Sequence, residues 1–166
     1  PDGLASFQVV VEPREFVTRK GFDGLLPTFE LTPLAAETIA RIHDRLRAVP
    51  GIESVGGMTH QPVNSLVIPR FAVWPAPTPA EPSRQPSSRT VAGFLVTPDF
   101  FATMRTPVLR GREVSDGDGR TAPPVVVINQ VAERLLFPGR RALGERLVVD
   151  LYAGAPAREV IGVVAD

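Results

Sequence analysis

The clearest pattern of hydrophobic and polar positions lies in residues 32–51, TPLAAETIARIHDRLRAVPG. Its large apolar residues recur at spacings of three and four positions: Ile39, Ile42, Leu46 and Val49. Thr32 is a typical helix cap, Pro33 suits the first helical position, and Pro50 with Gly51 closes the pattern. The segment therefore predicts an amphipathic helix.

Short runs of apolar and β-branched residues predict strands elsewhere in the chain. These runs are residues 6–13, 52–58, 65–74, 90–96, 107–115 (strand or turn), 125–128, 142–151 and 158–166. Residues 14–31 have no clean period and contain Gly21, Gly24 and Pro27, which favours a loop with at most a short strand. Residues 75–89 hold five prolines and three serines, which favours an extended, mobile loop inside one domain over an interdomain linker.

Two shorter helices are predicted from their first residues. Thr97 as cap, Pro98 at the first position and Asp99 near the positive end of the dipole predict a helix through Met104. Its large apolar residues are expected in the core: Phe100, Phe101 and Met104. Asn129 predicts the cap of a second helix, whose expected apolar face is Val131, Leu135 and Leu136.

The order of these elements predicts an α+β fold. Strand, helix and strand over residues 6–58 form one split βαβ unit, and the strand at 125–128 opens a second one. Between them lies an irregular, β-rich middle.

Composition narrows the class of protein. A chain of 166 residues is the size of one domain, and 43% hydrophobic with 22% charged residues is close to the globular average. The 18 basic and 18 acidic residues give a formal net charge of zero, which removes the field that nucleic-acid and anionic-membrane binders usually carry. We therefore expect no nucleic-acid partner.

Cysteine is absent, so the chain has no disulfide, thiol nucleophile or cysteine-ligated metal. No run approaches the roughly 18 apolar residues of a membrane span, and no signal-peptide pattern opens the chain. The chain also begins at Pro1 rather than methionine. We interpret it as an excised fragment or a processed chain, not itself embedded in a membrane.

Candidate sites for metal or catalysis are weak. His43 is expected to be solvated on a charged helix flank, and His60 has no ligand at metal-site spacing. Asp116 and Asp118 resemble the start of a calcium loop, but Arg120 and Val127 occupy positions that need oxygen ligands. Phosphate-binding and nucleophile-elbow motifs are also missing. The sequence therefore predicts no catalytic residue, cofactor or metal.

Three residues are candidates for contact with a partner. Trp74 lies at the edge of the proline-rich loop, where an exposed aromatic side chain would be available. Arg110 and Arg112 are two positions apart on a predicted strand and would share a face, where they could hold an anion. The commoner outcome is ion pairing with nearby acids such as Glu113 and Asp116.

Five segments in order resemble the periplasmic core domain of MacB-like, FtsX-type ABC transporter permeases, in particular the large orphan permeases of that group. They cover about two-thirds of the chain and are LRAVPGIESV (46–55), VTPDFFATMRTPVLRGREVSDGD (96–118), PPVVVINQVAERLLFPG (123–139), ALGERL (142–147) and REVIGVVAD (158–166).

The resemblance implies a two-lobed domain between the first and second transmembrane helices of a bacterial inner-membrane permease. The porter-like lobe, of two βαβ units, would span about 1–60 and 122–166. The smaller α/β insert would span about 61–121 and include the loop 75–89. It further implies mechanotransmission without covalent chemistry: a cytoplasmic ABC ATPase drives the permease, and the periplasmic domain engages a second permease copy or a periplasmic partner protein.

Two other functions remain open. A solute- or peptide-binding module would use the cleft between the lobes, lined by apolar and convergent polar groups. A hydrolase would need a carboxylate or histidine pair brought together by the fold, which makes it the weaker alternative.

Overall fold

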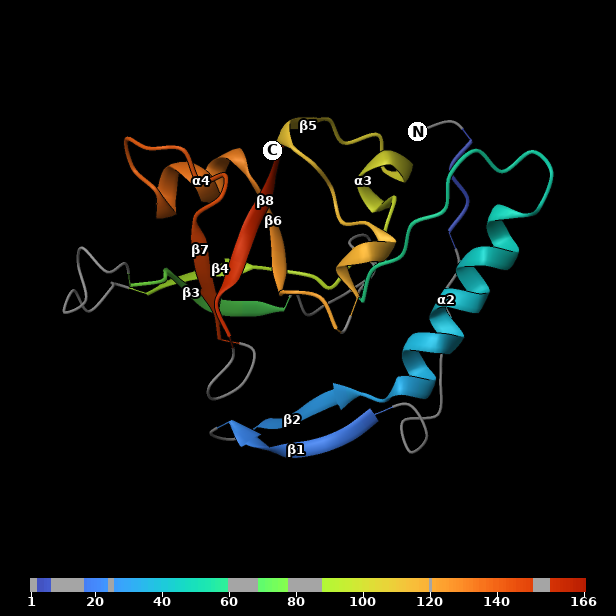
Figure 1. Cartoon of the computed structure of the whole chain (residues 1–166), viewed down its shortest axis with the longest axis horizontal. Helices are drawn as coiled ribbons and strands as arrows, with labels where there is room; N and C mark the ends of the chain where they lie inside the picture. The colour runs from blue at the N-terminus through green and yellow to red at the C-terminus, as the bar shows by residue number, and fades with distance from the viewer. Residues whose placement is uncertain are drawn as a thin grey trace. The chain divides into compact units, whose positions relative to one another are not determined.

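The computed structural model describes residues 3–6, 17–23, 26–59, 69–77, 88–119, 121–150 and 156–166. They belong to two compact units of the chain, Pro1–Val49 and Pro50–Asp166 (Figure 1). Among them lie eight strands, three α-helices and one short 3₁₀ helix. The strand predicted at 6–13 and most of the proline-rich loop, residues 78–87, lie outside the described residues.

The first unit contains a β-hairpin that the sequence pattern did not reveal. Strand β1 (Val17–Asp23) pairs antiparallel with β2 (Leu26–Leu31), so the prediction of a loop over residues 14–31 is wrong there. The register shifts between Arg19 and Gly21. Such an irregularity breaks the alternation of side chains by which a strand is recognised in a sequence.

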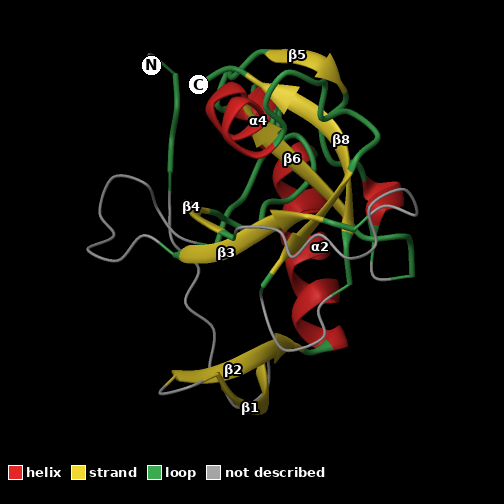
Figure 2. Ribbon diagram, turned by 90° about the vertical axis from the view of Figure 1, so that its left-hand side faces the viewer, coloured by secondary structure: helices red, strands yellow, loops and turns green. Residues whose placement is uncertain are grey.

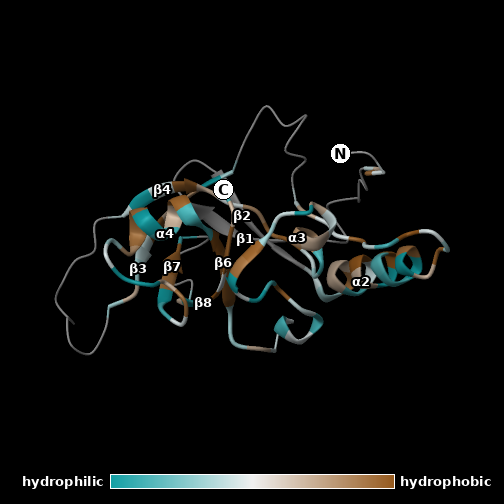
Figure 3. Ribbon diagram, turned by 90° about the horizontal axis from the view of Figure 1, so that it is seen from above, coloured by the Kyte–Doolittle hydropathy of each residue, from teal (hydrophilic) through white to brown (hydrophobic). Residues whose placement is uncertain are grey.

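Helix α2 (Pro33–Arg47) confirms the helix predicted from the apolar spacing. The Thr32 hydroxyl accepts a hydrogen bond from the Ala35 N–H at 3.3 Å, which satisfies one of the free donors of the first turn. Apolar and polar residues alternate along its ribbon (Figure 3). Two members of the predicted apolar face are nevertheless exposed, Ile39 to 41% and Val49 to 47%.

His43 lies on the buried side of α2, together with Ala35. Its exposed fraction is only 7%, so the prediction of a solvated histidine is wrong. The charged neighbour Asp44 suggested an exposed flank, but adjacent positions on a helix point about 100° apart and need not share an environment.

The second unit is organised around one six-stranded sheet. Its strands are β3 (Arg70–Pro75), β4 (Arg89–Ala92), β5 (Val108–Gly111), β6 (Val125–Asn129), β7 (Arg146–Val149) and β8 (Arg158–Val164). The order is β4-β3-β7-β8-β5, with β6 also paired to β8. The β6–β8 pair is parallel and the other pairs are antiparallel (Figure 2).

Strand β8 is the centre of this sheet because it pairs with three strands. The parallel strand β6 accompanies it along nearly its whole length, whereas β7 pairs with its start and β5 with its end. Val160 and Val163 have no exposed surface. The apolar sequence of the strand follows from this position, since a central strand is covered on both faces.

Helix α4 (Gln130–Leu136) follows β6 directly and contributes to the core. The Asn129 side chain accepts a hydrogen bond from the Ala132 N–H at 2.9 Å, which confirms the predicted cap. Leu136 is buried, but Val131 and Leu135 are 50% and 43% exposed. The prediction of an apolar face is therefore wrong for two of its three residues. The core cluster consists of Val73, Ile128, Leu136, Phe137, Ala142, Leu147, Val160 and Val163.

The strand predicted at 52–58 does not form. Only Met58 makes an isolated bridge, to Val96, and the strand predicted at 90–96 is confined to β4. The segment instead lies beside residues 95–97: the Thr97 N–H donates to the Gly57 carbonyl at 2.9 Å, and the Gly57 N–H donates to the Thr97 hydroxyl at 2.8 Å. The second predicted βαβ unit does contain a parallel pair of strands. In it β6 pairs with β8 rather than with β7.

The short helix α3 (Phe100–Thr103) begins two residues later than predicted. Thr97 is not its cap, because its hydroxyl is bonded to Gly57, and Asp99 takes the cap position in the left-handed region at φ 59°. Phe100 and Phe101 are half-buried and meet edge to face at 5.3 Å between ring centroids. Met104 is 36% exposed, so its predicted place in the core is wrong.

The predicted α+β class is confirmed, as a mixed fold with a single six-stranded sheet. The two lobes and their boundaries, about 1–60 with 122–166 and 61–121, stay a prediction.

The close approach of β8 to the backbone after β5 gives a test of this architecture. A Cβ on Gly162 would lie 2.1 Å from the Arg112 carbonyl oxygen, a backbone atom that cannot move aside alone. We expect Gly162→Ala to lower the free energy of unfolding by about 3 kcal/mol, measured by urea denaturation. Gly117→Ala is the matched control, because its nearest neighbour is 3.7 Å away. Equal stability of the two variants would contradict this packing.

Candidate functional site

Arg110 connects strand β5 to helix α4. It forms an ion pair with Glu133, whose side chain is only 12% exposed. The other oxygen of this carboxylate accepts a hydrogen bond from the Ala142 N–H at 3.1 Å. Glu133 therefore holds together three segments that are separate in the sequence: β5, α4 and the turn before β7.

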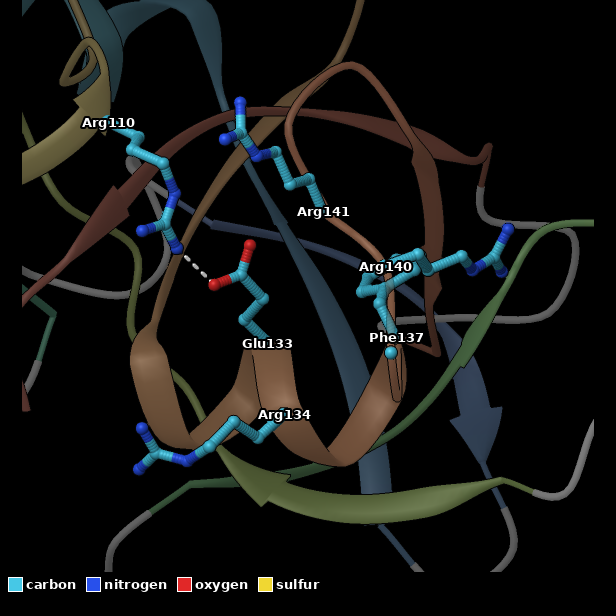
Figure 4. Close-up of a pocket in the computed structure, with 7 residues that line it drawn as sticks. Arg110, Glu133, Arg134, Phe137, Arg140 and Arg141 are labelled. Atoms are coloured by element: carbon cyan, nitrogen blue, oxygen red, sulfur yellow. Dashed lines mark hydrogen bonds and ion pairs between the residues drawn. The ribbon is translucent and has the colours of Figure 1, made fainter.

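A shallow, open pocket of about 360 Å³ surrounds this ion pair (Figure 4). Its lining is Arg110, Glu133, Arg134, Phe137, Gly139, Arg140 and Arg141. The concentration of arginines comes from the end of α4 and the turn that follows it. Gly139, at φ 76°, lets the chain reverse direction there.

Two of the arginines in the lining have partners outside the pocket. Arg134 pairs with Asp166 at 3.0 Å, and the same carboxylate accepts the Val131 N–H at 2.7 Å. Arg140 lies 3.6 Å from the carboxylate of Glu145, and its guanidinium is 5.3 Å from the centre of the Phe137 ring.

Arg112 belongs to a different cluster, at the 3₁₀ helix η1 (Asp116–Asp118). Its guanidinium donates two hydrogen bonds to the Asp118 carboxylate, at 2.6 and 2.8 Å. Asp118 also accepts from the Ser115 N–H and hydroxyl, both at 2.8 Å. The Arg112 guanidinium, helped by Ser115, holds the pKa of Asp118 well below its usual range, although burial opposes the shift.

The two candidate arginines thus have different partners. Both are in ion pairs, as the commoner interpretation predicts, but the partners are Glu133 and Asp118. The expected acid Glu113 accepts the Phe101 N–H at 3.2 Å and supports the start of α3. A register shift before Arg110 and the left-handed Gly111, at φ 72°, separate the two side chains, so the strand spacing alone was misleading.

Trp74 lies within strand β3, opposite Val148 of β7, and is half-buried. Its role in contacting a partner stays a prediction. Nothing in the described residues groups three side chains that could hold a metal ion, and His60 lies outside them. A second open hollow, of about 700 Å³, lies around Gly111, Leu143 and Ile161.

Three residues of this site were not predicted from the sequence: Glu133, Arg140 and Arg141. The adjacent arginines after Pro138 and Gly139 were a visible signal, since a helix-ending turn exposes the side chains that follow it. Glu133 had no such signal, because its importance depends on Arg110, 23 residues earlier, which only the fold brings near.

Comparison with known proteins identifies the family. The family model described as MacB-like periplasmic core domain matches residues 6–166, and the chain belongs to this family. No curated protein matches the chain.

Two solved structures are similar to it. The crystal structure of the periplasmic region of MacB from Actinobacillus actinomycetemcomitans aligns with a TM-score of 0.52 and 17% identity, over 76% of this chain and 50% of that one. The extracellular domain of the noncanonic ABC-type transporter YknZ from Gram-positive bacteria aligns with a TM-score of 0.48 and 17% identity, over 76% and 56%. The chain therefore spans about half the length of these structures, and the likeness to MacB concerns the fold.

The family matches the one that the five sequence segments indicated, a domain of ABC transporter permeases. In the part of the chain that the structure describes, no helix has the length and apolar character of a membrane span.

The Arg112–Asp118 pair predicts a specific pH dependence. Because folding lowers the pKa of Asp118, its stabilising contribution is present at neutral pH and is lost as the pH falls below the ordinary aspartate value of about 4. We expect Asp118→Asn to be less stable than the wild type near pH 7 and the difference to shrink near pH 3, measured by urea unfolding. Asp150→Asn, at an exposed position, is the control. Parallel pH profiles for wild type and Asp118→Asn would contradict the assignment.

Proposed function

We propose that the chain is the extracytoplasmic domain of an ABC transporter permease that transmits ATPase-driven conformational change into the periplasm. The match of the family model to residues 6–166 carries this proposal. The domain would lie on the outer side of a bacterial inner membrane, flanked by transmembrane helices, and would itself catalyse no reaction.

The packing of the second unit supports a mechanical role. A domain that passes on a displacement must move as a body, and closely packed interiors transmit strain because they compress little. Here the buried strand β8 is bonded on both sides. The Arg110–Glu133 pair joins β5 to α4, and the Arg134–Asp166 pair joins α4 to the residues after β8.

The proposed partners follow from the family. A cytoplasmic ABC ATPase would act through the membrane part of the permease, and the domain would meet a second permease copy or a periplasmic partner protein. Trp74, Arg110 and Arg112 are candidates for that contact. Arg110 and Arg112 already have internal ion pairs, so a partner would meet each of them beside its carboxylate, Glu133 or Asp118.

Spin labels would test the transmission directly. The chain contains no cysteine, and Ala102 is an exposed residue of α3, so Ala102→Cys gives one label per domain in a full-length permease freed of other cysteines. We expect the distance between the labels of two permease copies, measured by pulsed electron resonance, to change by several ångström between the nucleotide-free and ATP-bound states.

A variant whose ATPase cannot bind nucleotide is the control and should keep the nucleotide-free distance. An ATP-bound distance identical to the nucleotide-free one would contradict mechanotransmission but would leave the family assignment intact.

A further inference from the structure

The arginines that line the pocket around Arg110 and Glu133 outnumber the carboxylates that are paired with them. Four guanidiniums line it: Arg110, Arg134, Arg140 and Arg141. Three carboxylates are paired with them: Glu133, Asp166 and Glu145. One positive charge is therefore left over.

That charge belongs to Arg141. Its side chain is exposed, and no described residue forms a hydrogen bond or an ion pair with it. Figure 4 shows that Arg134 and Arg140 point away from Glu133, whereas Arg110 points at Glu133 and Arg141 rises on the same side of the pocket. The carboxylate of Glu133 is thus paired with Arg110, and Arg141 lines the same pocket without an ion pair to a described residue.

Arg110 has hydrogen-bonding capacity left as well. A guanidinium presents several N–H donors in a planar fork, and Glu133 occupies only part of this fork. The buried Nε–H of Arg110 has no hydrogen-bond partner. The other N–H groups of the fork, which Glu133 leaves unbound, can donate to a further acceptor in the pocket.

We propose that this pocket is a binding site for one external carboxylate group, held between Arg110 and Arg141. A carboxylate matches the planar fork of a guanidinium and carries the single negative charge that the pocket lacks. Phosphate, with a charge near −2, would exceed that need. The carboxylate can come from an acidic side chain of another protein or from a small free carboxylate. The site does not depend on mechanotransmission.

Titration of the 166-residue chain with simple probes tests the site. The probes are sodium acetate, and a blocked tripeptide with glutamate at its centre, each at constant ionic strength with chloride. The nuclear magnetic resonance signals of the arginine Nε–H groups are the readout. We expect saturable shifts at Arg110 and Arg141 with a dissociation constant on the order of 10 mM, and a weakening of about tenfold or more in Arg141→Gln.

Arg89→Gln, an exposed arginine of β4, removes the same charge elsewhere and should bind like the wild type. Tighter binding of the tripeptide than of acetate would identify a protein side chain as the source of the carboxylate. Equal binding of the two probes would identify a small free carboxylate. A blocked tripeptide with glutamine should not bind. Shifts that never saturate, equal affinity of Arg141→Gln and wild type, or binding of inorganic phosphate without acetate would overturn the proposal.

Discussion

The structure depends on the central strand β8. It is the only strand in the described part of the chain that pairs with three others, and its backbone passes so close to Arg112 that position 162 has no room for a side chain. At Gly111 an added Cβ would likewise lie 2.1 Å from the Ile161 carbonyl oxygen. Two glycines facing each other across β5 and β8 therefore set how closely these strands approach, and with it the position of both arginine clusters.

Charge pairs then fix the elements around this sheet. Arg110 reaches from β5 to α4, and Arg112 reaches from the end of β5 to η1. Because the Glu133 side chain is largely buried, loss of Arg110 would leave an uncompensated charge there, which is costly in a protein interior. Arg141 differs from these residues because it forms no hydrogen bond or ion pair with a described residue. Its exposed guanidinium is therefore the charge on which the proposed carboxylate site depends.

Helix caps were predicted correctly from the sequence where the capping residue bonds only to the next few residues of the chain. Thr32 and Asn129 cap the helices that they were predicted to cap, since capping needs only the next few N–H groups. Thr97 shows the limit of this reasoning. Its sequence context is equally favourable, but its hydroxyl is bonded to Gly57, 40 residues away, and the helix starts later. A tertiary hydrogen bond competed with the local one.

The sequence by itself determined the family, the α+β class and the approximate place of α2, α4, β6, β7 and β8, because apolar periodicity and ordered motifs are properties of the chain alone. Only the tertiary structure decided which residues are buried and which charges meet. His43 became buried, Val131 and Leu135 stayed exposed, and Arg110 found Glu133. The reason is physical: burial and ion pairing depend on distances between segments far apart in sequence, and no local pattern contains those distances.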